Sequence, residues 1–493
     1  MSTSHPPGRP PTYNLDMNRA SRSYDLLWLS LALLPLIGLS FLISIPAQDY
    51  WWYLRLGQDI LKSGSIPAVD TIGWSRAGLP IFYQQWLAGL LFWGAYTLGG
   101  ASLTFLLRGL LIALTYGLIW FMLRSVSGPR LATILTILLG LASSNNWVMR
   151  PQLFVYPLFG LCLWVLYRWQ AGQNKLLWLL PLATLLWVNL HGSFALPIVL
   201  AGAALVFGTG QRKPLLIAVI AMFVATLLNP HGLGVWGYLA FILTSPSDQL
   251  FSVEWRPPLN LGWQMNLFFG WLLAFPLLAA FSPRKLTRLE WVWFLGFGWL
   301  ALSGIRYGIW FLFLLAIFTA TLLAEWTNRF LDRPVENLNP RLNLALSRLI
   351  LLLSLLFLPG LREAWWKAAP PLYEETTTPI AAVNWLAAHP DLRGEMWNDY
   401  AFGSYLAFAL PSRRPWIDTR MYSFPPEQWA SYTQISNGDP AWEYIFQRGN
   451  INLLLLSRTS QAPLIKAVEA SSDWCKQYRD PYAVIFARCE FMR

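Results

Sequence analysis

The sequence predicts a polytopic α-helical membrane protein with about 11 transmembrane helices and a C-terminal extracytoplasmic α/β domain. Of its 493 residues, 55% are hydrophobic and 12% are charged, whereas charged residues make up about 25% of a soluble domain. After residue 366 the long apolar runs give way to alternating short helical and strand patterns, which are typical of an α/β fold. The net charge of +11 does not indicate nucleic acid, because no basic stripe with stacking aromatic residues occurs.

Eleven apolar runs account for the predicted membrane helices, although several are shorter than the roughly 20 residues of a perpendicular span. They lie at about 26–45, 102–123, 131–147, 152–167, 176–190, 193–208, 214–228, 264–281, 290–304, 307–324 and 347–361. A further apolar segment, 86–98, decides the topology, because counting it as a span inverts the orientation of everything after it. We therefore used the basic residues to place it.

The basic residues favour a segment 86–98 that lies in the outer interface without crossing. One side of the membrane then carries 16 Lys and Arg residues, and the loops of the other side carry 6. The larger set is Arg9, Arg19, Arg22, Arg124, Arg130, Arg168, Lys175, Arg212, Lys213, Arg284, Lys285, Arg288, Arg329, Arg333, Arg341 and Arg348. We expect a multi-pass protein of the inner (plasma) membrane, with a cytoplasmic N-terminus and an extracytoplasmic C-terminal domain.

Three regions are expected along the chain: a disordered cytoplasmic tail at 1–25, a transmembrane domain at 26–365 with its first outer loop at 46–100, and the α/β domain at 366–493. In the last region we expect helices at 379–388, 400–410, 426–435, 440–447 and 461–471, strands at 394–398, 415–418 and 451–456, and a terminal hairpin at 474–489. Cys475 and Cys489 flank the turn of this hairpin, and either pair as a disulfide or remain free thiols.

Polar residues that are costly in a membrane gather at the outer ends of the predicted spans. The candidate site residues among them are Asp49, Asp70, Arg108, Arg150, His191, Glu254 and Arg306. Asp49 stands where the first span leaves the membrane, and is either a functional group or the N-cap of the helix that follows. Trp51 and Trp52 directly after it are typical of interfacial anchors.

These residue types suit a lipid-linked phosphate. Arg108, Arg150, His191 and Arg306 supply cations or donors for phosphate oxygens. Asp49 suits a general base, or a ligand for a divalent cation such as Mg or Mn together with Asp70 or Glu254. Each has a structural alternative: Arg108 reaching the interface, His191 completing a helix end, Arg306 acting as an anchor. No P-loop, GxSxG or HExxH motif occurs.

The first outer loop carries the pattern D-x-W-W-x-L-x-x-G-x-x-I, then G-x-I-P-x-x-D, G-x-P and W-L. Its residues are Asp49, Trp51, Trp52, Leu54, Gly57, Ile60, Gly64, Ile66, Pro67, Asp70, Gly78, Pro80, Trp86 and Leu87. This pattern resembles the first loop of the GT-C superfamily, most closely bacterial integral membrane proteins related to polyprenyl-phosphate mannosyltransferases. Further matches extend the resemblance over nearly the whole chain: Arg150-Pro151-Gln152, Asn229-Pro230, Glu254-Trp255, Trp397-Asn398-Asp399-Tyr400 and Ile417-Asp418 with Arg420 and Tyr422.

The resemblance implies a membrane glycosyltransferase that moves a sugar from a polyprenyl-phosphate-linked donor to a glycan, lipid or protein acceptor on the extracytoplasmic side. It also implies that Asp49 is the base. The sequence departs from the family at Gln84-Gln85, where relatives often carry His-Glu, and at Tyr53, where they often carry His. The alternative is a non-enzymatic protein of the same fold, such as an assembly or lipid-handling factor; a transporter ranks third.

The C-terminal domain adds a further hypothesis. Asp399, Asp418 and Arg420 either form an acceptor-facing surface or serve turns and strand ends by hydrogen bonding.

Overall fold

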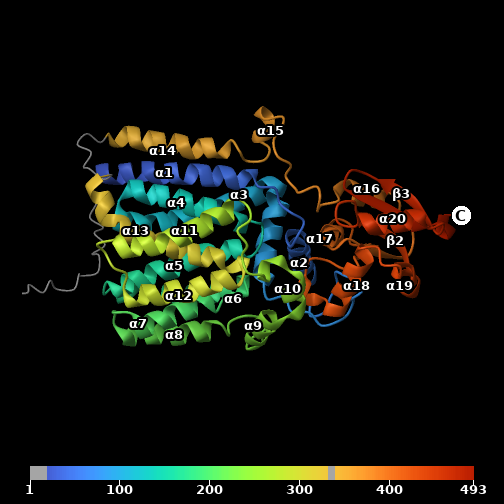
Figure 1. Ribbon diagram of the computed structural model, residues 1–493, viewed down its shortest axis with the longest axis horizontal. Coiled ribbons are helices and arrows are strands. Elements are labelled where there is room, and N and C mark those ends of the chain that lie inside the picture. The colour runs from blue at the N-terminus through green and yellow to red at the C-terminus, as the bar shows by residue number, and fades with distance from the viewer. Residues whose placement is uncertain (1–18, 331–338, 493) are drawn as a thin grey trace, which may run out of the picture.

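The computed structural model describes residues 19–330 and 339–492, which form a helical bundle and a smaller α/β unit at one end of it (Figure 1). The bundle helices run along the long axis of the molecule, and the four-stranded sheet lies beyond the end of the bundle. Residues 1–18, expected above to be disordered, lie outside the described residues. Helix α1 begins at Arg19, so residues 19–25 are helical and do not belong to a disordered tail.

Each of the eleven apolar runs forms a helix, the structure that satisfies its own backbone hydrogen bonds where water is absent. The helices are α1 (Arg19–Leu42), α3 (Trp86–Ser127), α4 (Pro129–Ser143), α5 (Gln152–Gln170), α6 (Leu179–Leu190), α7 (Leu196–Phe207), α8 (Arg212–Ala225), α11 (Trp263–Phe281), α12 (Arg288–Ser303), α13 (Gly308–Phe330) and α14 (Pro340–Leu355). Four described stretches are long and apolar enough to cross a membrane: Arg22–Leu42, Trp86–Ser127, Gly262–Phe281 and Ile305–Trp326.

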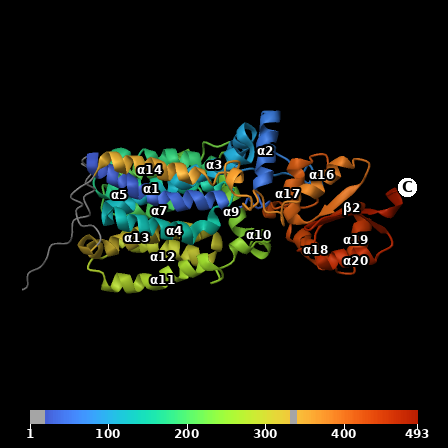
Figure 2. The same cartoon turned by 90° about the horizontal axis from the view of Figure 1, so that it is seen from above.

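Helix α3 bends at Gly99 and Gly100, which separates segment 86–98 from the rest of the helix. Gly100 has a φ of 57°, a left-handed conformation that glycine adopts without the steric cost of a Cβ. The segment before the bend packs on α2 (Tyr50–Ser63), which lies across the end of the bundle in Figure 2. The two backbones touch at Gly57, where an added Cβ would lie 2.3 Å from the Gly89 carbonyl oxygen.

Short elements complete the bundle end that faces the α/β unit. They are α9 (Gly234–Thr244), α10 (Pro246–Phe251), the 3₁₀ turns Val253–Trp255 and Ile305–Tyr307, and α15 (Arg362–Trp365). Two more 3₁₀ turns, Ser144–Asn146 and Asn174–Leu176, connect bundle helices. Helix α10 touches the α/β unit directly, since the Ser247 hydroxyl donates to the Phe424 carbonyl at 2.8 Å.

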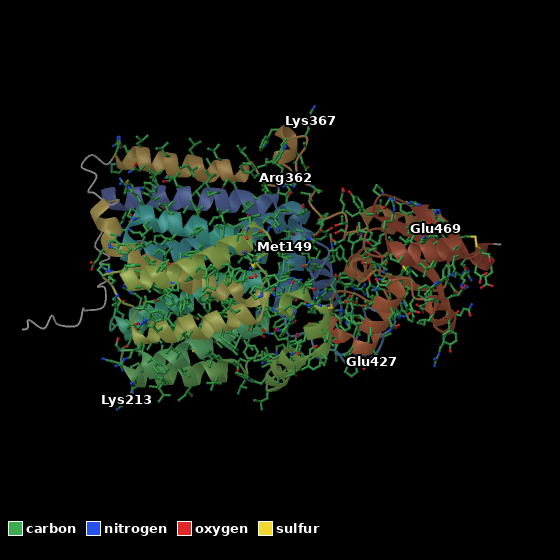
Figure 3. The ribbon with its side chains drawn as sticks, viewed as in Figure 1. Met149, Lys213, Arg362, Lys367, Glu427 and Glu469 are labelled. Atoms are coloured by element: carbon green, nitrogen blue, oxygen red, sulfur yellow. A yellow bond between two sulfur atoms is a disulfide. The ribbon has the colours of Figure 1, made fainter. Side chains whose placement is uncertain are left out.

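The opposite end of the bundle carries basic loops that contact one another. Arg124 at the end of α3 pairs with Asp25 in α1 at 3.0 Å, and Arg284 after α11 pairs with Glu325 in α13 at 3.7 Å. Figure 3 places Lys213 at this end, remote from the α/β unit. These two ion pairs and Lys213 thus lie at the end of the bundle that is farthest from the sheet.

The α/β unit has a four-stranded sheet in the order β1-β2-β4-β3. Its strands are β1 (Glu395–Asn398), β2 (Ile451–Ser457), β3 (Trp474–Arg479) and β4 (Ala483–Arg488); only β1 and β2 are parallel. Its helices are α16 (Ile380–Ala388), α17 (Tyr400–Ala409), α18 (Pro426–Ser436), α19 (Trp442–Arg448) and α20 (Ala462–Ala470), with 3₁₀ turns at Met421–Ser423 and Cys489–Met492. The small C-terminal sheet that the sequence predicts is present, and a disulfide joins Cys475 to Cys489.

The predicted strand at 415–418 is wrong. The Asn398 side chain accepts from the backbone N–H of Trp416 at 2.8 Å and donates to the carbonyl of Ile417 at 2.9 Å. These bonds replace a strand ladder, and the Pro415 carbonyl turns instead to the backbone N–H of Trp74 at 3.0 Å. An apolar pattern therefore marks a buried but irregular segment here.

Strands β2 and β4 are buried on both faces of the sheet, because successive side chains point to opposite faces and nearly all of those in β2 and β4 are buried. Leu453 and Leu455 of β2 join the core that continues into the bundle, whereas Leu454 and Leu456 pack in a second core with Trp397. The two cores bury most of the aromatic residues of the unit. One face of the sheet thus belongs to the same apolar core as the bundle, with α17 in contact with α2.

Trp51 and Trp52 are not interfacial anchors. Each is only 2% exposed. The Trp51 ring contacts Tyr405 at 4.8 Å and Phe408 at 5.1 Å between centroids, and both rings come from α17. Trp51 therefore packs the α/β unit on α2, whereas Trp52 contacts Tyr53 and Tyr83 and lines the cavity described below.

Candidate active site

A cavity of about 250 Å³ lies where the bundle end meets the α/β unit. Its walls come from four segments of the chain, residues 48–53, 150–152, 238–255 and 419–422, and from the single residues Gln85, His191, Arg306 and Tyr400. Residues from the helical bundle and from the α/β unit face each other across it. The site therefore lies at the interface between the helical bundle and the α/β unit.

Asp49 directly precedes α2, but it does not cap the helix, because its side chain accepts no backbone N–H of the first turn. Its Oδ2 lies 2.9 Å from Nε of Arg150, and its Oδ1 accepts from the indole N–H of Trp52 at 3.2 Å. Burial raises the pKa of Asp49 above its usual range, and the nearby Glu254 carboxylate adds to this, while Arg150 opposes it. Of the two alternatives from the sequence, the capping role is excluded.

Arg150 precedes α5 and lies between two carboxylates. Besides Asp49, its guanidinium contacts Glu254, where Nη1 meets Oε1, and donates from Nη2 to Oε1 of Gln48 at 2.8 Å. Burial acts to lower the pKa of Arg150, but the charges of Glu254 and Asp49 outweigh it and raise the pKa above its usual range. Each of the three guanidinium nitrogens thus lies beside an oxygen of Asp49, Glu254 or Gln48, so Arg150 is engaged by groups of the protein itself.

Glu254 belongs to the 3₁₀ turn Val253–Trp255, and its side chain is 36% exposed. Burial acts to raise its pKa, but Arg150 and Arg306 outweigh burial and lower the pKa below its usual range. The pKa values of Glu254 and Asp49 thus move in opposite directions. Such divergence is a feature of paired carboxylates with different chemical tasks.

Arg306 is the cation of the cavity that keeps its hydrogen-bonding capacity. It lies in the 3₁₀ turn Ile305–Tyr307, with its guanidinium carbon 4.6 Å from the centroid of the Trp255 ring. It makes no hydrogen bond or ion pair within the part of the chain that the structure describes. The aromatic contact fixes the guanidinium plane without using its N–H groups, which remain available to an anion.

His191 follows α6 and is 7% exposed. Its Nδ1 accepts from the backbone N–H of Ser193 at 3.1 Å, which leaves the proton of the neutral ring on Nε2. Burial, with Arg306 and Arg150 nearby, lowers the pKa of His191 to about 3. His191 is therefore a neutral donor in the cavity.

Both departures from the family pattern lie at the site. Tyr53 and Gln85 line the cavity, and Nε2 of Gln85 donates to the hydroxyl of Tyr238 at 3.3 Å. Gln84 is buried and donates to the carbonyl of Val188. At Gln85, the position that departs from the resembled pattern, this cavity therefore has an amide.

Two candidate residues do not join the cavity. Arg108 is buried in α3, donates to the Ile43 carbonyl at 2.5 Å and stacks on Phe105, because it faces α1 across the bundle. Asp70 is bonded within its own loop, where Oδ1 accepts from the backbone N–H of Ile72 at 2.8 Å, and its Oδ2 pairs with Arg420 at 3.1 Å. Asp70 and Arg108 therefore do not line the cavity.

The acceptor-surface residues of the α/β unit mainly hold the fold together. Asp399 caps α17 by accepting from the backbone N–H of Ala401 at 2.9 Å. Asp418 is fully buried and pairs with Arg420 at 2.6 Å, and Arg420 also donates to the hydroxyl of Tyr83 at 2.9 Å. Arg420 thus joins the α/β unit to Asp70 and Tyr83 of the first outer loop, and it also lines the cavity.

Sequence reasoning overlooked other lining residues. Gln48 holds Arg150, and Tyr238 and Tyr422 form part of the wall from α9 and from the α/β unit. Gln48 is adjacent to Asp49 in sequence, so a polar residue next to a membrane-exit carboxylate was the available signal. The tyrosines are two among 19 in the chain, and nothing in their local sequence distinguishes them.

The residues present do not suit a divalent cation. Asp49 and Glu254 both contact Arg150, and Asp70 lies elsewhere. Within residues 19–330 and 339–492, no group of three or more His, Cys, Asp or Glu side chains is placed to hold a metal ion. A cation entering between the two carboxylates would have to displace the guanidinium.

Comparisons with known proteins establish the fold. No family model and no curated protein matches the sequence. Among solved structures, the chain is similar to the oligosaccharyltransferase AglB from Archaeoglobus fulgidus in complex with an inhibitory peptide and a dolichol-phosphate, with a TM-score of 0.57, 12% identity and coverage of 95% of this chain and 74% of AglB. AglB has also been solved in complex with Zn and sulfate.

Two further neighbours come from bacteria. ArnT from Cupriavidus metallidurans bound to undecaprenyl phosphate has a TM-score of 0.50 at 14% identity, and the match covers 95% of this chain and 97% of ArnT. The arabinofuranosyltransferase AftD from Mycobacteria has a TM-score of 0.57 at 15% identity, covering 96% of this chain and 42% of AftD. The neighbours are GT-C glycosyltransferases, so the chain is a membrane protein with the GT-C fold that its motifs resemble.

Proposed function

We propose that this protein is a membrane glycosyltransferase that moves a sugar from a polyprenyl-phosphate-linked donor to an acceptor hydroxyl. The observation that carries the proposal is the cavity in which Asp49, Arg150 and Glu254 form one ion-pair cluster beside Arg306. Three neighbours of the same fold support it, two of which have been solved with polyprenyl-type phosphates. The acceptor belongs to the glycan, lipid or protein class.

The donor phosphate is assigned to Arg306 and His191. Arg306 has free N–H groups, and neutral His191 offers a donor on Nε2; both line the cavity and a second, contiguous space of about 90 Å³. That space continues between apolar residues of α9 and α13, including Leu239, Leu243 and Trp310. A phosphate at Arg306 would therefore have its isoprenoid chain directed along an apolar path.

Asp49 is assigned the role of general base. The acceptor hydroxyl gives its proton to Asp49, and its oxygen bonds to the anomeric carbon of the sugar. The bond from that carbon to the phosphate oxygen breaks, and polyprenyl phosphate leaves. The raised pKa of Asp49 favours proton transfer, because a base works best with a pKa near the operating pH. A phosphate leaving group needs little acid assistance.

The topology assigned from the sequence belongs to the same proposal. The basic loops lie at the bundle end remote from the α/β unit, and the cavity lies at the other end. Positive loops favour the cytoplasmic side. We therefore assign the cavity and the α/β unit to the extracytoplasmic side of the inner membrane, with eleven spans and with segment 86–98 in the interface.

Asp49→Asn tests the proposal, since it keeps the side chain's shape and removes the base. We expect normal expression and donor binding with sugar transfer reduced by about 10²–10⁴-fold. The matched control is Asp59→Asn on the same helix, because Asp59 pairs with Arg55 at 2.9 Å and does not line the cavity. Full transfer by Asp49→Asn would refute the base assignment.

One observation favours the non-enzymatic alternative: Gln85 supplies an amide where relatives often carry a carboxylate. If purified wild type consumes no polyprenyl-phosphate sugar from any hexose or pentose donor, while its Arg306→Ala variant loses binding of polyprenyl phosphate, the cavity is a lipid-binding site without catalysis.

A further inference from the structure

The ion-pair cluster of the cavity places three side-chain oxygens around one positive centre. They are Oδ2 of Asp49, Oε1 of Glu254 and Oε1 of Gln48, and each contacts a different nitrogen of Arg150. The oxygens come from two distant segments, and the cation comes from a third. Carboxylate and amide oxygens are also the ligands that hard divalent cations take.

The charges at this point balance without an added ion. Three carboxylates line the cavity, those of Asp49, Asp248 and Glu254, together with three guanidinium groups, those of Arg150, Arg306 and Arg420. Two carboxylates held close together without a cation would repel each other, and one would take up a proton. A divalent cation added to the existing arrangement would instead leave an excess of positive charge beside Arg150.

Arg150 is fixed in place by the fold. It directly precedes α5, whose first turn begins with the backbone N–H of Leu153 donating to the Arg150 carbonyl at 3.0 Å. The preceding residue, Met149, is fully buried and lies inside the bundle in Figure 3. The backbone of Arg150 is therefore held by the fold, and its guanidinium lies between the carboxylates of Asp49 and Glu254.

We propose that Arg150 is a built-in cation that takes the place of a divalent metal ion in this site. It holds Asp49 and Glu254 in position and makes transfer independent of divalent cations. Removing the guanidinium leaves Asp49, Glu254 and Gln48 as a divalent-cation site. The role in transfer rests on the proposed function, whereas the exclusion of metal by Arg150 does not.

The probe is Mn²⁺, and the readout is the electron paramagnetic resonance signal of free Mn²⁺ titrated with purified full-length protein in nanodiscs. We expect no binding to wild type that depends on Asp49. Arg150→Ala should bind one Mn²⁺ per chain, at least tenfold more tightly than wild type. Arg150→Ala combined with Glu254→Gln should lose this binding. Arg256→Ala is the control, because Arg256 is exposed and does not line the cavity.

Two outcomes would overturn the inference. One is Mn²⁺ binding by wild type that disappears in Asp49→Asn; the other is a folded Arg150→Ala variant that binds no Mn²⁺. Should Arg150→Ala fail to fold, wild type alone decides: its donor consumption should withstand exhaustive chelation, and loss of activity restored by Mn²⁺ or Mg²⁺ contradicts a built-in cation. A wild type that consumes no donor at all, but shows the expected Mn²⁺ pattern, refutes the proposed function and not the metal exclusion.

Discussion

Replacement of Arg306 by alanine should weaken donor recognition without affecting the chemical step. Arg306 is held by the Trp255 ring at 4.6 Å, while its N–H groups face the cavity without a described partner. A hydrogen bond to a charged group contributes about 1.5–3 kcal/mol. The loss of one such bond to a phosphate oxygen raises the donor KM roughly 10- to 150-fold, since each 1.4 kcal/mol is a factor of ten.

Lysine should restore only part of this loss. Arg306→Lys keeps a positive charge near Trp255 but lacks the planar fork that binds two phosphate oxygens. The assay is the initial rate of sugar transfer as a function of donor concentration at saturating acceptor, in membranes with equal protein levels. We expect the donor KM to rise in the order wild type, Arg306→Lys, Arg306→Ala, with kcat changed much less.

Arg256→Ala is the matched control for this series. Arg256 lies close to Glu254 in sequence, but it is exposed and donates to the Leu250 carbonyl at 3.0 Å. Its donor KM should stay at the wild-type value. An unchanged donor KM in Arg306→Ala, in a preparation where Asp49→Asn is inactive, would reduce Arg306 to a structural contact of Trp255.

Three further outcomes are expected. Activity should fall with acid as Asp49 becomes protonated, at a pH above the ordinary aspartate pKa of about 3.9; the Glu254 charge raises the pKa of Asp49, so Glu254→Gln should move the acid limb of the kcat/KM profile to lower pH. Arg420→Met leaves Asp70 and Asp418 buried without their cation, and should cost roughly 3–5 kcal/mol of stability, seen as a lower thermal midpoint, whereas the exposed Arg479→Met should not change it. In the topology proposed here position 211 is cytoplasmic, so Gln211→Cys should react with an impermeant thiol reagent only after the cells are opened. Cys162→Ser removes the free cysteine, and Cys475 and Cys489 are joined in a disulfide, so neither adds to the labelling. Labelling in intact cells would contradict the topology.

The helices of the bundle were predictable because an apolar run in a membrane protein has only one way to satisfy its backbone. Segment 86–98 is separated from the rest of α3 by the bend at Gly99 and Gly100, while its place in the interface stays a prediction from the basic residues. The strand at 415–418 was not, because its backbone partner is the side chain of Asn398. The sequence pattern at 415–418 indicates burial but not which groups form the hydrogen bonds of its backbone.

The site was predictable in part. Asp49, Arg150, His191, Glu254 and Arg306 all line the cavity, since each lies at the end of the bundle that faces the α/β unit. Arg108 stands at a similar depth but faces α1, because the direction of a side chain around a uniformly apolar helix leaves no mark in the sequence. Likewise, charge alone could not show that Arg150 is occupied by carboxylates while Arg306 is free.

The walls of the cavity come from segments that are far apart in the sequence, which affects how the protein folds during its synthesis. Residues 48–53 are translated early, but Thr419, Arg420 and Tyr422, which close the cavity, are made some 370 residues later. Until then the cavity lacks this wall, and Trp51 lacks its contacts with the rings of Tyr405 and Phe408. The nascent chain therefore carries an unfinished site that only its last-made part can seal, and this interval is when a chaperone or a membrane insertase would be needed most.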